Sequence, residues 1–435
     1  MAGGLMQLVA YGAQDVYLTG SPKVTFFQAV YKRHTNFAME NIEQVVNGTA
    51  AANARLSVTV ARNGDLIGEM YLELTAKSGL AALSSNTAAT MEWIAERSVS
   101  DIELTIGGQR IDKHYQKWWR LYSELYLDEA KRVQYGKMTS TTDTTADIGK
   151  VFLPMVFFFN RNPGLYLPLI ALQYHEVRLD ITLHSTYATY FDTNAVKVWG
   201  NYVYLDTEER RRFAQKGHEY LIEQVQHTGV DTVSVNNPTA PKQIRLSYNH
   251  PVKELVWCFS NTGTASTYND MWDTTSTETA NLTTTYVLNT APSGDNVYSA
   301  SLSTVGSPMM VVSSNVWLGE DGAFSDKGVG PLATFKLILN GQDRFKEQSG
   351  KYFNQVQPFN HHSGNPYPGI YSYSFALKPE EHQPTGTCNF SRIDNAQVAV
   401  AQKTDTVRTT SMHMFAVNYN VLRIQSGMGG LAFSN

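Results

Sequence analysis

Histidines and carboxylates are the residues of this 435-residue chain that could bind a metal or catalyse a reaction, and their spacing favours neither role. The adjacent pair His361 and His362, beside Asn360, is the better metal candidate in the sequence. Adjacent histidines in a loop of Gly, Pro and Asn face solvent far more often than they bind a metal, so we expect both to face water. The sequence predicts no metal site and no cofactor.

Two carboxylates, Asp101 and Glu103, lie on one face of a predicted strand and could imitate the acid pair of a glycosidase. Alternate strand residues of like charge are ordinarily the solvent-facing side of a sheet, which is the interpretation we favour. The sequence also lacks the GxSxG, GxxxxGK[ST], HExxH and helix-opening GxGxxG motifs. We therefore expect no catalytic residue, and the protein is not predicted to be an enzyme.

The cysteine count and the net charge argue against a disulfide-stabilised protein and against a nucleic-acid-binding protein. Cys258 and Cys388 are too few for a disulfide framework and do not form a CxxC pair, so we expect small buried hydrophobic side chains. A formal net charge of −4 and the absence of a basic tail argue against direct nucleic acid binding. The run Arg210 to Arg212 follows Glu208 and Glu209, which favours a solvated or inter-domain helix face over a phosphate site.

Three asparagines stand in Asn-x-Ser/Thr sequons that could carry a glycan. We expect Asn47, followed by Gly48, in a turn, Asn389 packed in a repeated segment, and Asn281 accessible. The N-terminus lacks the basic flank and apolar core of a secretory signal, so we do not expect the host secretory route. The longest apolar run, Val151 to Phe159, is shorter than the roughly 20 residues that cross a bilayer, and no transmembrane segment is predicted.

The elements that position these residues are mainly strands. Val177, Leu179, Ile181 and Leu183 alternate with polar residues, as in a strand with one buried face. Helical spacing is confined to Asp112 to Lys137, which Gly136 could close, and to Asp206 to Gln215. The predicted strands are 40–46, 55–61, 66–75, 101–106, 151–159, 176–184 and 196–205 in the first half, and 220–226, 243–248, 252–259, 334–339, 371–377, 393–401 and 413–424 in the second.

Short segments recur in the same order in both halves, which indicates a tandem duplication. Ile42 to Val45 returns letter for letter as Ile222 to Val225, and the Gly-Gln step at Gln109 returns at Gln342. Arg178-Leu179-Asp180 is matched in the same way with Arg392-Ile393-Asp394, and further weak matches follow the same order.

A duplicated set of short strands predicts an all-β protein made of two tandem eight-stranded antiparallel jelly rolls, a double jelly roll, with short helices in loops. The predicted domains are an N-terminal arm over residues 1–24, a first roll over 25–211 and a second roll over 212–435. The second copy is longer than the first between Phe259 and Pro331. Its Thr-, Ser- and Asn-rich stretch from 262 to 331 is expected to form loops that face water.

Several long motifs resemble one family. The segments MAGGLMQLVAYGAQDVYLTG, IGGQRIDKHY, PGLYLPLIALQYHEV, LNGQDRF, GTCNFSRIDNA and NYNVLRIQSGMGGLAF closely resemble the major capsid protein of the large icosahedral DNA viruses of chlorella-like algae, within the nucleocytoplasmic large DNA viruses. The resemblance runs from Met1 to Asn435, although residues from about 260 to 330 do not match the family pattern.

The resemblance implies a structural subunit of the virion, synthesised and assembled in the host cytoplasm. It implies a homotrimer with a pseudo-hexagonal outline, which contacts neighbouring capsomers and minor capsid proteins in a shell over an internal membrane. It also implies covalent N-linked glycans, attached by virus-encoded enzymes outside the usual sequon. Asn261 and Asn289 become candidates under that rule, beside the sequon asparagines Asn281, Asn47 and Asn389.

A lectin-like or carbohydrate-active β-sandwich is the alternative function, favoured by the aromatic content of 11% and by the Asp101 and Glu103 pair. The mass of the protein in solution distinguishes the two functions, because a capsid subunit requires a stable trimer whereas a lectin or a hydrolase can be monomeric.

Overall fold

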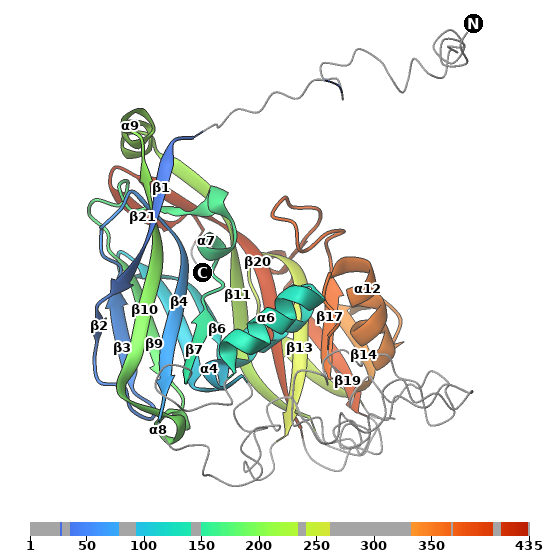
Figure 1. Ribbon diagram of the computed structural model, residues 1–435. Helices are drawn as coiled ribbons and strands as arrows, with labels where there is room; N and C mark the ends of the chain where they lie inside the picture. Colours follow the sequence, from blue (N-terminus) through green and yellow to red (C-terminus); the bar gives the residue numbers. More distant parts are fainter. Residues whose placement is uncertain are drawn as a thin grey trace, which may run out of the picture.

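The computed structural model describes residue 27 and residues 35–77, 93–140, 149–233, 241–261, 332–366, 369–402 and 410–433, with the backbone alone at 194, 260, 261 and 410 (Figure 1). The predicted N-terminal arm lies outside these residues, as do Asn281, Asn289 and the stretch from 262 to 331.

The first half forms two antiparallel sheets around one core. One sheet has the strand order β1-β10-β4-β7 with β8 beside β4, and the other has the order β2-β3-β9-β5-β6. The bounds are β1 Phe37–Gln44, β2 Val46–Asn47, β3 Arg55–Thr59, β4 Leu66–Ala76, β5 Val99–Ile106, β6 Gln109–Tyr115, β7 Lys150–Pro154, β8 Leu167–Pro168, β9 Val177–Leu183 and β10 Phe191–Leu205.

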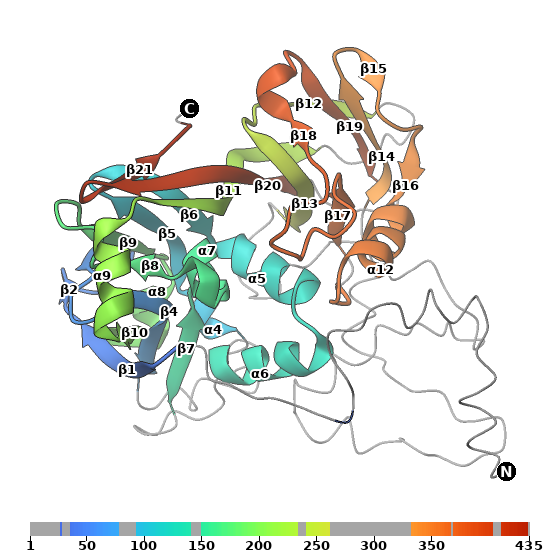
Figure 2. The same cartoon turned by 90° about the horizontal axis from the view of Figure 1, so that it is seen from above.

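The second half repeats this pairing order. Its sheets are β11-β20-β13-β17, with β18 and β21 attached, and β12-β19-β14-β15, with β16 attached (Figure 2). The bounds are β11 His218–Val233, β12 Lys242–Leu246, β13 Pro251–Asn261, β14 Leu332–Leu339, β15 Gln342–Asp343, β16 Gln348–Ser349, β17 Ile370–Ser374, β18 Cys388–Asn389, β19 Ala396–Gln402, β20 Thr410–Gln425 and β21 Met428–Leu431. The predicted pair of jelly rolls is confirmed.

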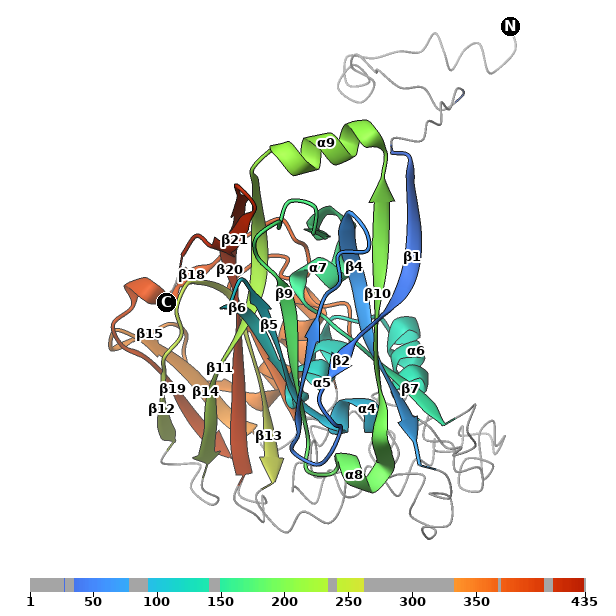
Figure 3. The same ribbon diagram turned by 90° about the vertical axis from the view of Figure 1, so that its left-hand side faces the viewer.

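Short helices connect the strands. They are α4 Ile94–Arg97, α5 Gln116–Leu125, α6 Glu129–Thr139, α7 Phe158–Arg161, α8 Tyr187–Tyr190, α9 Thr207–Gln215 and α12 Gln357–His361, with one-turn segments η2 Pro163–Leu165, η6 Tyr352–Val356 and η7 Phe390–Arg392. The helix predicted at Asp206 to Gln215 is α9, which joins the two halves (Figure 3).

The hydrophobic periodicity of the sequence located the long strands but failed where a short strand and a helix adjoin. Strand β9 buries Val177, Leu179, Ile181 and Leu183, as the alternation predicts. The single helix predicted at Asp112 to Lys137 is wrong: its first residues belong to β6, and the rest splits into α5 and α6 at the N-cap Asp128, with α6 continuing past Gly136. The strand predicted at Val151 to Phe159 stops at Pro154, before α7.

Strand registers test the repeated segments. Ile42 on β1 pairs with Gly200 on β10, and Ile222 on β11 pairs with Asn420 on β20. The two repeated segments therefore lie on corresponding edge strands, β1 in the first half and β11 in the second. Gln109 and Gln342 close corresponding hairpins.

One repeat match is wrong. Arg178 lies in β9, whereas Arg392 lies in η7, ahead of β19. The registers pair Val177 with Ile106 and Ala396 with Leu339, so the counterpart of Arg178 is Gln397. A three-residue likeness carries too little information to fix a register.

An aromatic stack fills the core of the second roll. Trp257, with no exposed side chain surface, lies 4.3 Å from Phe335, 5.4 Å from Phe353 and 5.9 Å from Tyr371 between ring centroids. The first-roll core contains aliphatic strand residues and the cluster Phe157 to Phe159.

Replacing Trp257→Ala is expected to lower the free energy of unfolding by about 3–5 kcal/mol, because it removes a large buried ring and leaves a cavity. Denaturant unfolding followed by circular dichroism measures this loss. Phe433→Ala, at a side chain that is 61% exposed, is the control and should change stability by less than about 0.5 kcal/mol. Equal effects of the two substitutions would contradict the assignment of this core.

Candidate functional site

The contact between the two rolls brings polar and aromatic side chains from both halves of the chain together. Its centre is α5, which leaves the first roll and packs on the second. Trp118 lies 5.7 Å from Phe415 of β20, and Tyr115 lies 5.0 Å from His227 of β11, between ring centroids. Phe415 and Ile222 belong to the same buried cluster as the first-roll core, so one hydrophobic region crosses the junction.

Hydrogen bonds join the edge strand β6 to β11 across this junction. The side-chain amide of Gln224 donates to the carbonyl oxygen of Ile111, and the backbone N–H of Val225 donates to Oδ1 of Asp112 over 3.0 Å. The edge of the first roll is thus covered by the second.

A buried carboxylate beside these bonds is held by cations from both rolls. Glu223, 5% exposed, lies 2.9 Å from Arg161 of α7 and 2.7 Å from Lys253 of β13. Burial raises the pKa of Glu223, but the two cations outweigh it and hold the pKa below its usual value. Nζ of Lys253 also donates to the carbonyl oxygen of Pro379 over 2.6 Å.

The expectation that His362 faces water is wrong. Its side chain is fully buried, with Nε2 3.1 Å from Glu254 and Nδ1 3.3 Å from Glu380, and the ring of Tyr126 in the first roll lies 5.2 Å away. Burial lowers the pKa of His362, but the two carboxylates raise it to about 9. No local pattern indicates this burial, because Glu254 and Glu380 come from other segments of the second roll and meet His362 only in the folded chain.

The loop after His362 completes the junction. Gly364 donates its N–H to the carbonyl oxygen of Leu125 over 2.9 Å, and a Cβ at this position would lie 2.2 Å from the carbonyl oxygen of Glu124. Arg132 of α6 donates to the carbonyl oxygen of Asn365 over 2.8 Å. Glycine at 364 is therefore a steric requirement of the contact.

The C-terminal strand β21 closes the other end of the junction. The N–H of Leu431 donates to Oε1 of Gln109 over 3.1 Å, and Nδ1 of His175 lies 2.8 Å from the carbonyl oxygen of Gly429. The end of the second roll thus binds the hairpin and loops of the first.

The other candidates for chemistry have structural explanations. Asp101 pairs with Lys113 at 3.4 Å and accepts from Thr182 over 3.0 Å, as a cross-strand group on the sheet surface. His361 lies 3.1 Å from the carbonyl oxygen of Leu377. In the part of the chain that the structure describes, no three His, Cys, Asp or Glu side chains are grouped to hold a metal ion, and no helix there could span a membrane.

The remaining predicted side chains are placed as follows. Cys258 is buried, which raises the pKa of its thiol to about 11, and Cys388 is partly exposed. Helix α9 buries none of its residues, and Arg210 pairs with Asp65 at 3.0 Å.

The glycan candidates differ in exposure. Asn47 is exposed at the end of β2, before Gly48 with φ of 113°. Asn389 was expected to be packed, which is wrong: it is exposed, and its side chain accepts from the N–H of Ser391 because it caps η7. Asn261 ends β13, while Asn281 and Asn289 lie outside the described residues.

The two ends of the rolls are distinct. At one end β1 begins at Phe37, opposite Leu205, beside α9. At the other end Val233 and Asn261 both face Thr410. Figure 1 shows α9 and the tip of β13 at opposite ends of the molecule.

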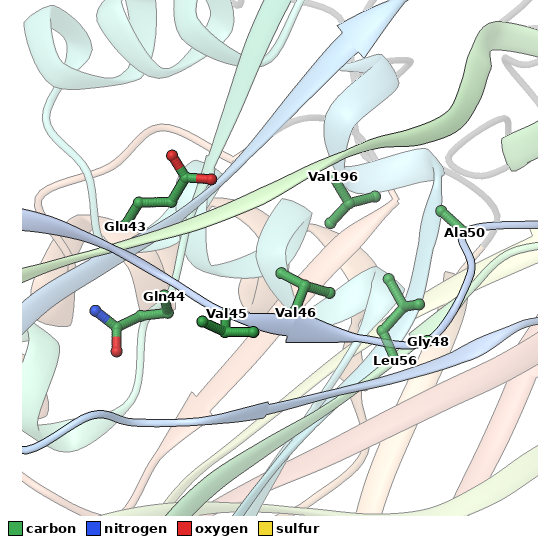
Figure 4. A pocket seen from close by; sticks show the side chains of 8 residues that line it. All are labelled: Glu43, Gln44, Val45, Val46, Gly48, Ala50, Leu56 and Val196. Atoms are coloured by element: carbon green, nitrogen blue, oxygen red, sulfur yellow. The ribbon is translucent and has the colours of Figure 1, made fainter.

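Two flanks expose large apolar side chains. On the flank at β1 these are Phe37, Met39 and Val45, exposed by 52%, 49% and 75%. Beside Val45 a pocket of about 430 Å³ opens, lined by Val46, Ala50, Leu56 and Val196 with Glu43 and Gln44 (Figure 4). On the flank at α12 they are Val356, Phe359 and Leu377, exposed by 42%, 87% and 74%.

The His362 cluster predicts a loss of stability in alkali. Because the folded-state pKa of His362 exceeds the ordinary 6.5, its ion pairs stabilise the fold fully below about pH 6.5, and this contribution of about 3 kcal/mol is lost as pH rises through 9. Melting temperatures measured from about pH 7 to about pH 10 should show it. His362→Gln should melt lower near pH 7 and lack this decline, and parallel pH profiles of the two proteins would refute the assignment.

Comparison with known proteins agrees with this architecture. Residues 25–206 match the family described as "Major capsid protein N-terminus", and residues 209–430 match "Large eukaryotic DNA virus major capsid protein". The chain is 42% identical to the major capsid protein of Paramecium bursaria Chlorella virus 1 and 38% identical to that of Phaeocystis pouchetii virus, with both chains fully covered in each case.

Solved structures give the same result. The chain resembles the subunit in a quasi-atomic model of the Paramecium bursaria Chlorella virus 1 capsid with a TM-score of 0.72 and 38% identity, over 94% of this chain and all of that one. The Faustovirus major capsid protein, at 12% identity and a TM-score of 0.63, shares the fold over 97% of this chain and 96% of its own. The lectin-like or carbohydrate-active alternative is not favoured, because the relatives that are 38% or 42% identical over the whole chain are major capsid proteins. The chain belongs to the family of major capsid proteins of large eukaryotic DNA viruses, and its role is to assemble into the capsid shell of the virion.

Proposed function

We propose that the chain forms homotrimeric, pseudo-hexagonal capsomers that tile an icosahedral shell. The observation that carries this proposal is the repeated strand order of the two rolls. Three chains with two such rolls each bring six similar units into a closed ring, and a six-sided unit fills a planar lattice.

The domains of this subunit are an N-terminal arm over residues 1–24, a first roll over 25–211 and a second roll over 212–435. The boundary falls within α9, which buries none of its residues and joins β10 to β11. We assign the arm to contacts with neighbouring copies, because its apolar residues from Leu5 to Tyr17 follow no strand or helix period.

The long insertion from 262 to 331 faces outward in this arrangement. Its bordering residues Asn261 and Leu332 lie at the end opposite α9: Asn261 faces Thr410, and Leu332 faces Gln402, near Lys242, whose side chain donates to the carbonyl oxygen of Thr232. Loops rich in Thr, Ser and Asn need water for their backbone groups, and the outside of a closed shell supplies it.

The inner end of the rolls is then the α9 end, which faces minor capsid proteins and an internal membrane under the shell. The subunit binds no nucleic acid directly, in keeping with its net charge of −4. Synthesis and assembly take place in the host cytoplasm. These partners follow from the family resemblance and from the orientation proposed above.

The trimer is tested by the mass of the purified protein in solution. We expect three times the chain mass of 48.5 kDa by sedimentation or native mass spectrometry. Deleting residues 2–20 should weaken assembly while both rolls keep their circular dichroism and melting profile. A monomeric full-length chain would refute the trimer, and an unchanged assembly profile of the shortened chain would refute the role of the arm.

Glycans are expected on the outward loops. Asn281 is the leading candidate in a standard sequon, with Asn261 and Asn289 as candidates outside it, and Asn47 and Asn389 as the remaining sequons. Glycopeptide mass spectrometry of purified virions locates them. Sugars confined to Asn47 or Asn389, with none between 260 and 331, would contradict the outward placement of the insertion.

A further inference from the structure

Three asparagines of the chain are followed directly by glycine, namely Asn47, Asn63 and Asn340. The backbone nitrogen of the next residue can attack the side-chain carbonyl carbon of an asparagine and close a five-membered imide ring. Glycine makes this attack easiest, because it has no Cβ to crowd the ring. The three steps share the same local chemistry, so the folded surroundings decide which of them reacts.

Hydrogen bonds hold Asn340 in place. It lies at φ of 50° in the two-residue turn between β14 and β15, before Gly341 at φ of 80°. Its N–H donates to the carbonyl oxygen of Asn395 over 2.7 Å, and its side-chain oxygen accepts from the N–H of Asn395 over 3.0 Å. The side chain must break this second bond before its carbonyl carbon can reach the nitrogen of Gly341.

Packing restrains the backbone on both sides of Asn63. Before it, the guanidinium of Arg62 donates to the carbonyl oxygens of residues 173 and 175 over 2.8 and 3.2 Å. After it, a Cβ added to Gly64 would lie 2.9 Å from Cβ of the buried Tyr202. Closing an imide ring changes the backbone torsions of both residues, and packed neighbours oppose that change here.

Asn47 has the fewest restraints of the three. It ends the two-residue strand β2 at the edge of the sheet β2-β3-β9-β5-β6, and both Asn47 and Gly48 are exposed. Within the described part of the chain, neither the Asn47 side chain nor the N–H of Gly48 makes a hydrogen bond. The reacting carbonyl carbon and its nucleophile are therefore open to water and able to move.

We propose that Asn47 is a site of spontaneous deamidation. The backbone nitrogen of Gly48 bonds to Cγ of Asn47 while the C–N bond of the side-chain amide breaks. The amide nitrogen takes the proton that Gly48 gives up and leaves as ammonia. Water then opens the imide at one of its two carbonyl carbons, which produces aspartate or isoaspartate.

A glycan at Asn47 would occupy the same amide nitrogen, since Asn47, Gly48 and Thr49 form a sequon. A sugar on this nitrogen would have to leave with it, so glycosylation protects the site. Deamidation, in turn, removes the nitrogen to which a glycan is attached. The two modifications of Asn47 therefore exclude each other.

The products alter the edge of the first roll. Both add a negative charge near the exposed Glu43, and isoaspartate also inserts an extra carbon into the backbone of β2. That strand pairs with β3 only through Val46 and Asn47, beside the pocket that Val46, Gly48 and Leu56 line (Figure 4). We expect isoaspartate to loosen this short pairing while the long strands keep theirs.

Full-length protein made in a bacterium without N-linked glycosylation tests the proposal. The folded protein is held at mildly alkaline pH, and peptide mapping by mass spectrometry follows the conversion of each amide to an acid. Asn47 should convert at least roughly tenfold faster than Asn340, because breaking the bond to Asn395 adds to the barrier at Asn340. Asn63 should also convert more slowly than Asn47. Labelling by an isoaspartyl methyltransferase identifies the isoaspartate product.

Unfolding and substitution provide the controls. In concentrated urea the three Asn-Gly steps should react at similar rates, because the restraints on Asn63 and Asn340 come from the fold. Asn47→Gln should abolish the fast conversion and leave the other two rates unchanged, since glutamine would have to close a larger ring. A folded wild-type protein in which Asn47 converts no faster than Asn340 would overturn the proposal, and this result needs no variant.

Discussion

The structure depends on covering sheet edges. A jelly roll is two open sheets, and each open edge presents unpaired backbone N–H and carbonyl groups that must find protein or water partners. In this chain the β6 edge of the first roll is covered by β11, which supplies Gln224 and Val225 as partners for Ile111 and Asp112. Duplication therefore provides more than a second domain, because each roll closes part of the other.

Buried charges determine how the rolls meet. The apolar contacts around Phe415 and Trp118 bury surface area but would allow the two rolls to slide against each other. Glu223 restricts this movement, because its carboxylate must stay within reach of both Arg161 and Lys253. Burying such ions gains little net stability, and removing one partner is costly, so they fix the relative orientation of the rolls more than they strengthen the contact. His362 with Glu254 and Glu380 lies wholly within the second roll, and Tyr126 of the first roll packs its ring against this buried group.

Sequence periodicity was sufficient for the fold because one face of most strands is buried. It predicted β9 and α9, whereas the two rolls were predicted from segments whose letters recur in the same order, such as those at Ile42 and Ile222. It missed β6, whose residues were merged with the helix that follows, and β15, which has only two residues. The junction was harder still: the burial of His362 is decided by carboxylates brought close by folding, which no local pattern records.

The pairing of distant strands also sets the order in which the nascent chain can mature. Strand β1 has its partner in β10, so the first sheet cannot close until Leu205 has left the ribosome, and β11 must wait in the same way for β20. Such long-range pairing is slow and leaves edges exposed during synthesis. Because β21 follows β20 in the chain and binds Gln109 of the first roll, this part of the junction forms only after the long strands of both rolls have been made. A chain that stopped before β21 would therefore contain the long strands of both rolls without the hydrogen bonds by which β21 holds Gln109 and His175 of the first roll.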